Sequence, residues 1–275
     1  FRASKFNSRI LEKCGAVTKI IKPEGKNPVV LARFEADPDA PTITFYGHYD
    51  VQPANEPTWK YNPFEVTTVD GFFYGRGTTD NKGPILAFVY AVRELIDKCG
   101  GIGRLPMNIA LLIEGEEENG SGGFKETLCA NPHWFKNTEL IVISNTLWIG
   151  KDRPCITYGM RGMITLSVEV YGPEVDLHSG NEGGALKEPM TDLVKILSSL
   201  QDSSNEVLIP GFYDGVNFEE VREKIKMFES LEDSIDMGKY AQSLGLDPVS
   251  DCSFAELLSK KWLMPTLSIV EIRTG

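Results

Sequence analysis

Histidine is almost absent from this chain of 275 residues, which contains only His48, His133 and His178. A metal site in such a chain must take most of its ligands from carboxylates. The five cysteines are scattered, odd in number and form no C-x-x-C pair. This pattern argues against a disulfide framework and favours reduced thiols in an intracellular protein.

Positive charge is also scarce, because 28 Lys and Arg residues face 39 Asp and Glu residues and the net charge is −11. This balance argues against nucleic acid or an anionic membrane as a partner, since both bind basic patches. No apolar run approaches the length of a membrane span, and Phe1 begins no signal peptide. The length suits one large or two ordinary domains, and, because the first residue is not Met, we expect an excised or processed piece.

The first part of the chain alternates predicted strands and helices. Several strands are apolar throughout, which is typical of an α/β sheet covered by helices on both faces. Strands 27–36 and 42–50 are expected to pair, because only a short turn-prone segment separates them. In chain order we expect a helix over 3–15, these two strands, a hairpin over 64–77 turning at Asp70 and Gly71, a helix over 82–100, a buried strand over 105–114, a short helix over 121–130 and a buried strand over 139–145.

The pattern changes near residues 158 to 162. Segment 163–172 alternates apolar and polar residues, as a half-exposed antiparallel strand does. Further helices are predicted over 188–202, 217–229 and 254–263, and a β-like segment over 265–275. We therefore expect a first α/β domain over 1–160 and a smaller α+β domain over 161–275.

Four polar segments follow the predicted strands of the first domain: GHYD (47–50), GRGTTDNKGP (75–84), EGEEENGS (114–121) and SN (144–145). In an open α/β sheet, the loops after the carboxyl ends of the strands meet in one crevice. Convergence would gather His48, Asp50, Asp80, Glu114, Glu116, Glu117, Glu118 and Asn145. So many carboxylates repel one another unless a cation neutralises them, and imidazole with carboxylates suits Zn²⁺ or a similar ion.

Each candidate also has an ordinary structural explanation. His48 could be a hydrogen-bonded residue at a strand end, Asp80 could cap the following helix, and Glu116, Glu117 and Glu118 could form a solvated acidic turn. His178 could lie in a surface turn, and His133, which belongs to no motif, is interpreted as structural. The joint occurrence of polar segments at successive strand ends favours a shared site.

The ordered segments GHYDVQPA, GRGTTDNKGP, EGEEENGS and LHSG resemble the M20 family of metallopeptidases, specifically the branch of cytosolic nonspecific dipeptidase and carnosinase. Segments DNKGP, SNTLW and 193–213 look like the peptidase-like subunit of the fungal glutathione-degrading complex. The resemblance implies a zinc-peptidase-type mixed sheet covered by helices. Residues 1–160 would be the first part of the catalytic domain, and 161–275 an incomplete lid and dimerisation domain.

The resemblance also implies a metal centre with two zinc ions per subunit, or one, with manganese as a possible substitute. Its implied ligands are His48 and Asn145 for the first zinc, Asp80 as the bridge and Glu118 for the second zinc. Glu117 would be the general base, Asp50 would orient the ring of His48, and His178 would reach the oxyanion from the lid, often across a dimer.

Two features depart from the family pattern. The family has an aspartate where Asn145 stands, and a neutral amide oxygen is a weaker zinc ligand than a carboxylate. We therefore expect the first zinc to bind less tightly. The family also takes its last zinc ligand from a histidine near the C-terminus, whereas no histidine follows His178. The chain ends at Gly275 within the expected lid, so we expect a fragment.

The function implied by the resemblance is a di- or tripeptidase-type metallohydrolase subunit in cytosolic glutathione breakdown. Its partners would be a short peptide, a glutamine-amidotransferase-like subunit that attacks the γ-glutamyl bond, and a second copy bound through the lid. Two alternatives stay open: an independent zinc dipeptidase that cleaves Cys-Gly-like peptides, and a catalytically weakened scaffold for the amidotransferase-like subunit.

Overall fold

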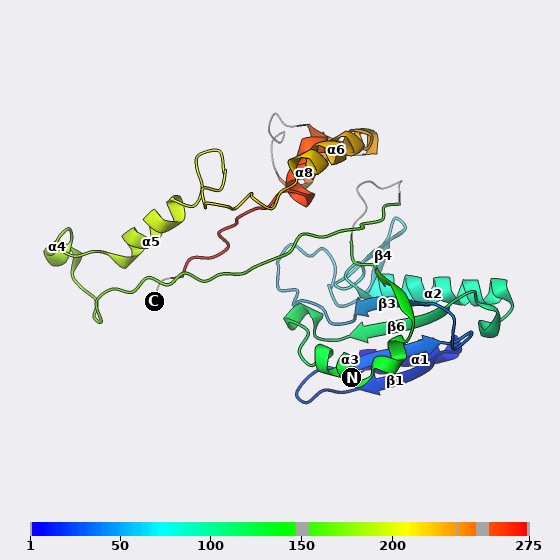
Figure 1. The fold of residues 1–275 in the computed structure, drawn as a ribbon. Coiled ribbons are helices and arrows are strands. Elements are labelled where there is room, and N and C mark those ends of the chain that lie inside the picture. The colour runs from blue at the N-terminus through cyan, green and yellow to red at the C-terminus, as the bar shows by residue number, and fades with distance from the viewer. Residues whose placement is uncertain (1, 147–153, 235, 246–252, 274–275) are drawn as a thin grey trace. The chain divides into compact units, whose positions relative to one another are not determined.

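The computed structural model describes residues 2–146, 154–234, 236–245 and 253–273 (Figure 1). The chain divides into two compact units, Phe1–Thr146 and Leu147–Gly275, and each is described by itself. The sequence placed the boundary nearer to residue 160, and that domain assignment stays a prediction.

The first unit is an α/β layer, and the helices predicted over 3–15, 82–100 and 121–130 are confirmed as α1, α2 and α3. Its elements in chain order are α1 (Arg2–Lys13), β1 (Val17–Ile21), β2 (Val29–Phe34), β3 (Thr42–His48), β4 (Thr67–Val69), β5 (Phe72–Tyr74), α2 (Lys82–Cys99), η1 (Ile102–Arg104), β6 (Asn108–Glu114), η2 (Glu117–Asn119), α3 (Phe124–Ala130), η3 (Pro132–Phe135) and β7 (Thr138–Ile143).

Five of these strands form one mixed sheet in the order β1-β2-β6-β3-β7. Strand β6 runs antiparallel to β2 and parallel to β3, and β3 also runs parallel to β7. The expected direct pairing of β2 with β3 is wrong, because β6 lies between them. Every residue of β6 is buried. A position at the centre of the sheet suits such a strand, because neighbouring strands pair with the main-chain groups along both of its edges.

Asn108, the first residue of β6, explains how the short segment between β2 and β3 can cross this strand. Its Oδ1 accepts hydrogen bonds from the main-chain N–H groups of Ala36 and Asp37 at 2.8 and 3.2 Å. Its Nδ2 donates to the carbonyl oxygens of Asp37 and Ala40 at 2.7 and 3.1 Å. The side chain of Asn108 is fully buried. Its amide therefore supplies the hydrogen-bond partners that the main chain of this segment would otherwise find in a hairpin.

Helices cover both faces of the sheet, as the sequence predicted. On one face, α1 and α2 pack their apolar residues, among them Leu11 and Val89, against Phe34, Phe45 and Leu111 of the strands. On the opposite face, residues of α3 and η3 pack against alternate strand residues: Phe124, Leu128 and Trp134 lie with Leu31 and Leu112. Each fully buried apolar side chain of this kind contributes roughly 1.5–3 kcal/mol to folding.

Strand β7 differs from the prediction, which expected it to be buried. It is the last strand of the sheet, and among the described residues it pairs only with β3. Leu140, Ile141 and Ile143 are 53%, 62% and 51% exposed. An apolar run identifies a strand, but its burial depends on whether another element lies beside it.

The hairpin and the end of α2 form as predicted, because residues that tolerate a left-handed backbone conformation lie at the positions that require it. Strands β4 and β5 pair antiparallel, and the turn between them has φ values of 50° at Asp70 and 81° at Gly71. Two positive φ angles are typical of a type I′ hairpin turn. Helix α2 is capped by Gly100, whose φ of 77° turns the chain so that the N–H of Gly101 bonds back to the carbonyl of Ile96 at 2.9 Å.

The second unit consists of helices and extended chain. The predicted helices over 188–202, 217–229 and 254–263 are confirmed as α5, α6 and α8. Its elements are α4 (Ser179–Glu182), α5 (Pro189–Ser198), α6 (Phe218–Glu229), η4 (Glu232–Ser234), α7 (Met237–Ser243) and α8 (Phe254–Trp262). A small core joins α6 to α8 through Phe228, Phe254, Ala255 and Leu258. No helix in the described parts of the chain has the length and apolar composition needed to cross a membrane.

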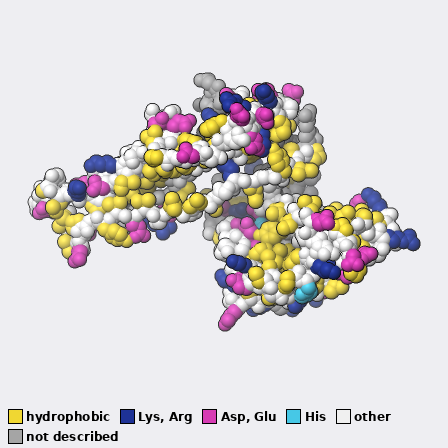
Figure 2. Space-filling model, in the orientation of Figure 1, with side chains coloured by type: hydrophobic (Ala, Val, Ile, Leu, Met, Phe, Trp, Pro, Cys, Tyr) yellow, Lys and Arg dark blue, Asp and Glu magenta, His cyan; other side chains and the backbone are white. Residues whose placement is uncertain are grey.

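The strands predicted over 163–172 and 265–275 do not form in the described residues of those segments. An alternating pattern creates a strand only when a neighbour completes the ladder, and the described part of this unit contains only isolated bridges. Apolar side chains therefore stay exposed along the extended chain, as Figure 2 shows in yellow. Ile156, Met163 and Leu166 are among them, with exposed fractions of 92%, 90% and 84%.

Candidate metal centre

The carboxyl ends of three parallel strands bring the polar segments of the first unit to one edge of the sheet. His48 ends β3, and Glu114, its partner in the ladder, ends β6. Strand β7 is parallel to β3 and ends at Ile143, just before Ser144 and Asn145. Segment 75–84 reaches the same edge at the start of α2. The structure therefore confirms that the polar segments meet at one edge of the sheet. Their side chains form separate groups there rather than a single cluster.

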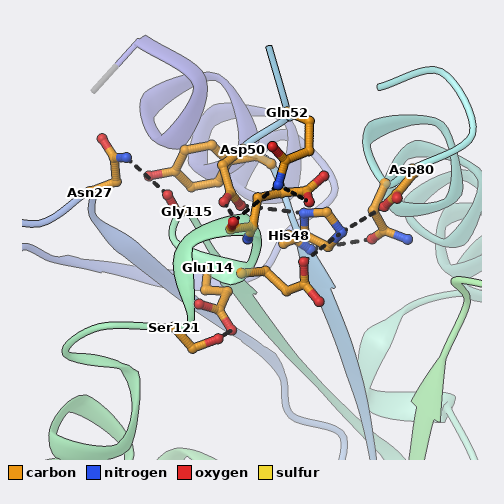
Figure 3. Close-up of polar contacts among 12 residues, drawn as sticks. Asn27, His48, Asp50, Gln52, Asp80, Glu114, Gly115 and Ser121 are labelled. Carbon is orange, nitrogen blue, oxygen red and sulfur yellow. Dashed lines mark hydrogen bonds and ion pairs between the residues drawn. The ribbon is translucent and has the colours of Figure 1, made fainter. Parts of the chain in front are cut away.

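His48 lies at the centre of this edge with both ring nitrogens facing carboxylates (Figure 3). The ring is 1% exposed. Its Nε2 lies 2.8 Å from Asp80 Oδ1 and 3.8 Å from Glu117 Oε2, while its Nδ1 lies 3.3 Å from Asp50 Oδ1. A neutral ring that carries its proton on Nδ1, toward Asp50, leaves the Nε2 lone pair directed at Asp80 and Glu117, which is the arrangement of a metal-binding histidine.

Asp80 and Asn145 take different positions around His48. Asp80 does not cap α2, because Asn81 stands at the N-cap of that helix. Among the hydrogen bonds of the described residues, none joins the side chain of Asn145 to His48 or Asp80. Asn145 Oδ1 accepts a 2.6 Å hydrogen bond from Asn81 Nδ2, and Asn81 Oδ1 accepts from the main-chain N–H of His48 at 3.3 Å. The buried Asn81, which the sequence did not single out, thus connects Asn145 to the end of β3.

Gly47 makes the approach of Asn81 to β3 possible. A Cβ at this position would lie 2.7 Å from Asn81 Oδ1 and 2.8 Å from Ile85 Cγ1 of α2. Both distances are too short for real side chains, so the residue before His48 must lack a Cβ. The glycine of the GHYD segment is therefore required by packing around the site.

The acidic turn after β6 is a built structure rather than a solvated loop, and Glu116 holds its outer side. Glu116 is 9% exposed and accepts a 2.9 Å hydrogen bond from the main-chain N–H of Asn27, with Lys26 Nζ at 3.7 Å. Asn27 Nδ2 in turn donates to the carbonyl of Gly115 at 2.9 Å. Glu116 therefore joins the turn to the loop between β1 and β2.

Glu114 holds the inner side of the same turn. It is 1% exposed, and its Oε1 accepts hydrogen bonds from Tyr46 Oη at 2.7 Å and Ser121 Oγ at 2.9 Å. Burial, followed by the hydrogen bond to Glu114, raises the pKa of Tyr46 above its usual value. Tyr46 therefore serves as a hydrogen-bond donor, and Glu114 serves as a support for the turn.

Glu117 and Glu118 are the two glutamates of the turn that face His48. One donor atom from each of these three residues lies within 4.8 Å of the others. Asp80 adds a third carboxylate, and one imidazole with several carboxylates is a donor set that fits zinc or a similar divalent cation. The geometry groups Glu117 with the metal donors, whereas the resemblance makes it the general base, so the division of roles between the two glutamates stays a prediction.

The surroundings of Glu117 shift its pKa upward. Burial makes the largest contribution to raising its pKa above the ordinary value, and the charges of Glu118, Asp50 and Asp80 add to it. The positive form of His48 acts in the opposite direction. A carboxylate with a raised pKa accepts a proton more readily than an ordinary glutamate does.

The other two histidines lie away from this edge in the sequence. His178 belongs to the second unit, where its Nδ1 accepts a 2.9 Å hydrogen bond from the main-chain N–H of Gly180. Its assignment to the oxyanion stays a prediction. His133 is an exposed residue of η3 beside Trp134, with ring centroids 6.0 Å apart.

Sequence reasoning missed four residues of the site: Asn27, Tyr46, Gln52 and Asn81. Tyr46, Gln52 and Asn81 each lie within two residues of a predicted site residue, so proximity in the sequence was the only signal for them. Asn27 lies 89 positions before Glu116, and no local pattern marks it.

Comparisons with known proteins agree with this geometry. The model of peptidase family M20/M25/M40 matches residues 44–243. The chain is 39% identical over 250 residues to a Cys-Gly metallodipeptidase, DUG1, of Candida albicans, covering 88% of this chain and 50% of the relative. It is 33% identical over 262 residues to a probable di- and tripeptidase, DUG2, of Saccharomyces cerevisiae, covering 91% of this chain and 28% of the relative.

Among solved structures, human carnosine dipeptidase 1 is similar, with a TM-score of 0.70 and 36% sequence identity over 98% of this chain and 58% of that chain. The chain spans about half the length of the curated relatives at the head of the comparison.

Proposed function

Since this chain belongs to peptidase family M20/M25/M40, we propose that it forms part of a zinc-dependent di- or tripeptidase-type hydrolase. The convergence of His48, Asp80, Glu117 and Glu118 at one edge of the sheet carries the proposal. The names of its fungal relatives, a Cys-Gly metallodipeptidase and a probable di- and tripeptidase, suggest short peptides of the glutathione type as substrates.

The residues would divide the work according to their contacts. His48, Asp80 and Glu118 would hold the metal, with Asn145 as a weaker neutral donor. A bound divalent cation polarises a peptide carbonyl and lowers the pKa of water. Glu117 would accept a proton from water and pass it to the leaving amine, and its raised pKa suits both transfers. Asp50 would hold the proton of His48 on Nδ1.

The setting that we propose is glutathione breakdown in the cytoplasm. A glutamine-amidotransferase-like subunit would attack the γ-glutamyl bond, and a second copy of this chain would bind through the second unit and bring His178 to the oxyanion. Asn145 supports a role for a partner, because a neutral donor in place of a carboxylate weakens the attraction for one metal ion. The partner would then supply the chemistry that this site performs poorly.

The test uses the full-length protein, stripped of metal and then titrated with zinc. Hydrolysis of Cys-Gly and of glutathione is measured with the protein alone and with the amidotransferase-like subunit. Zinc-dependent release of amino acids from at least one peptide is the expected result. Failure to take up zinc, together with unchanged glutathione breakdown by the complex when zinc is removed, would contradict the metallopeptidase and leave a scaffold.

A further inference from the structure

Gln52 contacts the metal-facing glutamate Glu118 in a way that the sequence did not indicate. It lies two residues after Asp50 in the loop that leaves β3. Its Nε2 donates to the carboxylate Oε2 of Glu118 at 3.0 Å and to the carbonyl oxygen of the same residue at 3.1 Å (Figure 3). A side-chain amide nitrogen has two hydrogens, so these two acceptors use both.

Glu118 is held at a third point by Asp50, whose Oδ2 accepts the main-chain N–H of Glu118 at 2.9 Å. The N–H, the carbonyl and the carboxylate of one residue are therefore bound by two side chains of a single loop. Asp50 and Gln52 fix the main chain, but only Gln52 binds the carboxylate.

The carboxylate of Glu118 needs such a donor because its neighbours repel it. Asp50 and Glu117 carry the same charge nearby, and the side chain of Glu118 is partly open to solvent, toward which it could rotate. A lysine or arginine in place of Gln52 would offset the repulsion but would also cancel the negative charge that attracts a cation. A neutral amide holds the carboxylate and leaves its charge intact.

We infer that Gln52 is a positioning residue, which keeps the carboxylate of Glu118 turned toward His48 and Glu117 so that a divalent cation meets a preformed set of donors. This inference rests on the proposed function, because it assumes that Glu118 binds metal. Loss of a side chain that orients a metal ligand typically weakens metal binding by about 10–100-fold.

The experiment compares Gln52→Met with Asn55→Met in the full-length protein. Methionine has nearly the length of glutamine and no N–H donor. Asn55 is an exposed amide of the same loop and borders the same surface depression, so it reports the effect of an added methionine without the contact to Glu118. Zinc affinity is measured by competition with a chromophoric chelator, and the melting temperature is measured on the zinc-free protein.

The expected result is that Gln52→Met binds zinc at least about tenfold more weakly than the wild type. Asn55→Met should match the wild type, and the three zinc-free melting temperatures should agree. Gln52→Ala should weaken zinc binding in the same way and serves as the second variant if Gln52→Met does not fold.

Two results would overturn the inference while leaving the proposed function standing. The wild type and Gln52→Met could bind zinc equally, or both Gln52 variants could lower the zinc-free melting temperature, which would make the role one of general stability. A wild type that takes up no zinc would overturn the inference and the proposed function together.

Discussion

Asp50 and Glu118 are joined by a 2.9 Å hydrogen bond from the main-chain N–H of Glu118 to Oδ2 of Asp50. The other oxygen of Asp50 faces Nδ1 of His48 at 3.3 Å. One carboxylate therefore lies between the end of β3 and the acidic turn after β6, with one oxygen facing the imidazole and the other bound to the main chain of Glu118. The side chain of Asp50 is 11% exposed, which protects this coupling from competition by water.

Replacing Asp50 by asparagine should weaken zinc binding. Asp50→Asn keeps the size of the side chain but removes the charge that we propose holds the proton of His48 on Nδ1. We expect zinc affinity to fall by about 10–100-fold. The control is Asp97→Asn, which removes one charge from an exposed position on α2. Equal zinc affinities in the two variants would contradict a coupling role for Asp50.

Replacing Glu117 by glutamine should separate catalysis from metal binding. Glu117→Gln removes the carboxylate that we propose as the proton acceptor and keeps its shape, so the rate of peptide hydrolysis should fall by about 10²–10⁴-fold. Zinc uptake, measured by elemental analysis, should be retained. Glu126→Gln, an exposed change in the first turn of α3, should leave the rate unaltered. Loss of zinc together with activity would make Glu117 a ligand rather than the base.

Replacing Asn145 by aspartate should strengthen the site beside His48. Asn145→Asp can still accept the hydrogen bond from Asn81 and adds a negative charge. Unit charges 4 Å apart attract by about 4 kcal/mol at an effective dielectric constant of 20, so a gain of roughly tenfold in zinc affinity is a conservative expectation. Asn119→Asp adds the same charge at an exposed position of the acidic turn and should gain less. Equal gains would indicate a general charge effect, without a role for position 145.

The stability of the zinc-free protein should depend on pH through Glu117. Its raised pKa means that the folded protein binds this proton more tightly than the unfolded chain does. The contribution of Glu117 to stability is therefore present at low pH and is lost as the pH rises from the ordinary value of 4.5 through the raised pKa. Denaturant unfolding should show Glu117→Gln gaining stability relative to the wild type across this window. A difference that does not change with pH would count against partial burial as the cause of the raised pKa of Glu117.

Replacing Glu116 by alanine should affect folding rather than the metal. Glu116→Ala removes the acceptor for the main-chain N–H of Asn27, and a lost partner of this kind costs about 1–3 kcal/mol. Denaturant unfolding of the zinc-free protein should show this loss, and zinc stoichiometry should not change. Glu65→Ala, an exposed change outside the turn, provides the baseline. A drop in zinc stoichiometry for Glu116→Ala would place this glutamate at the metal.

Local pattern was sufficient to predict most elements of the first unit. The hairpin at Asp70 and Gly71 and the end of α2 at Gly100 follow from residues that tolerate positive φ, and the convergence of the polar segments follows from parallel strands. The order of the strands was not predicted. Strand β6 lies between β2 and β3, and the hydrogen bonds that hold the segment joining β2 and β3 come from Asn108, about 70 residues away in the sequence. The exposure of β7 also depended on its neighbours rather than on its own apolar sequence.

The sequence by itself determined that one imidazole and a group of carboxylates stand at successive strand ends, because residue identity and strand periodicity are local properties. Only the tertiary structure decided what each glutamate of the acidic segment does. Glu114 and Glu116 turn toward Tyr46 and Asn27, while Glu117 and Glu118 turn toward His48. Adjacent carboxylates are chemically alike, so their division depends on the hydrogen-bond partners that distant segments place on either side of the turn.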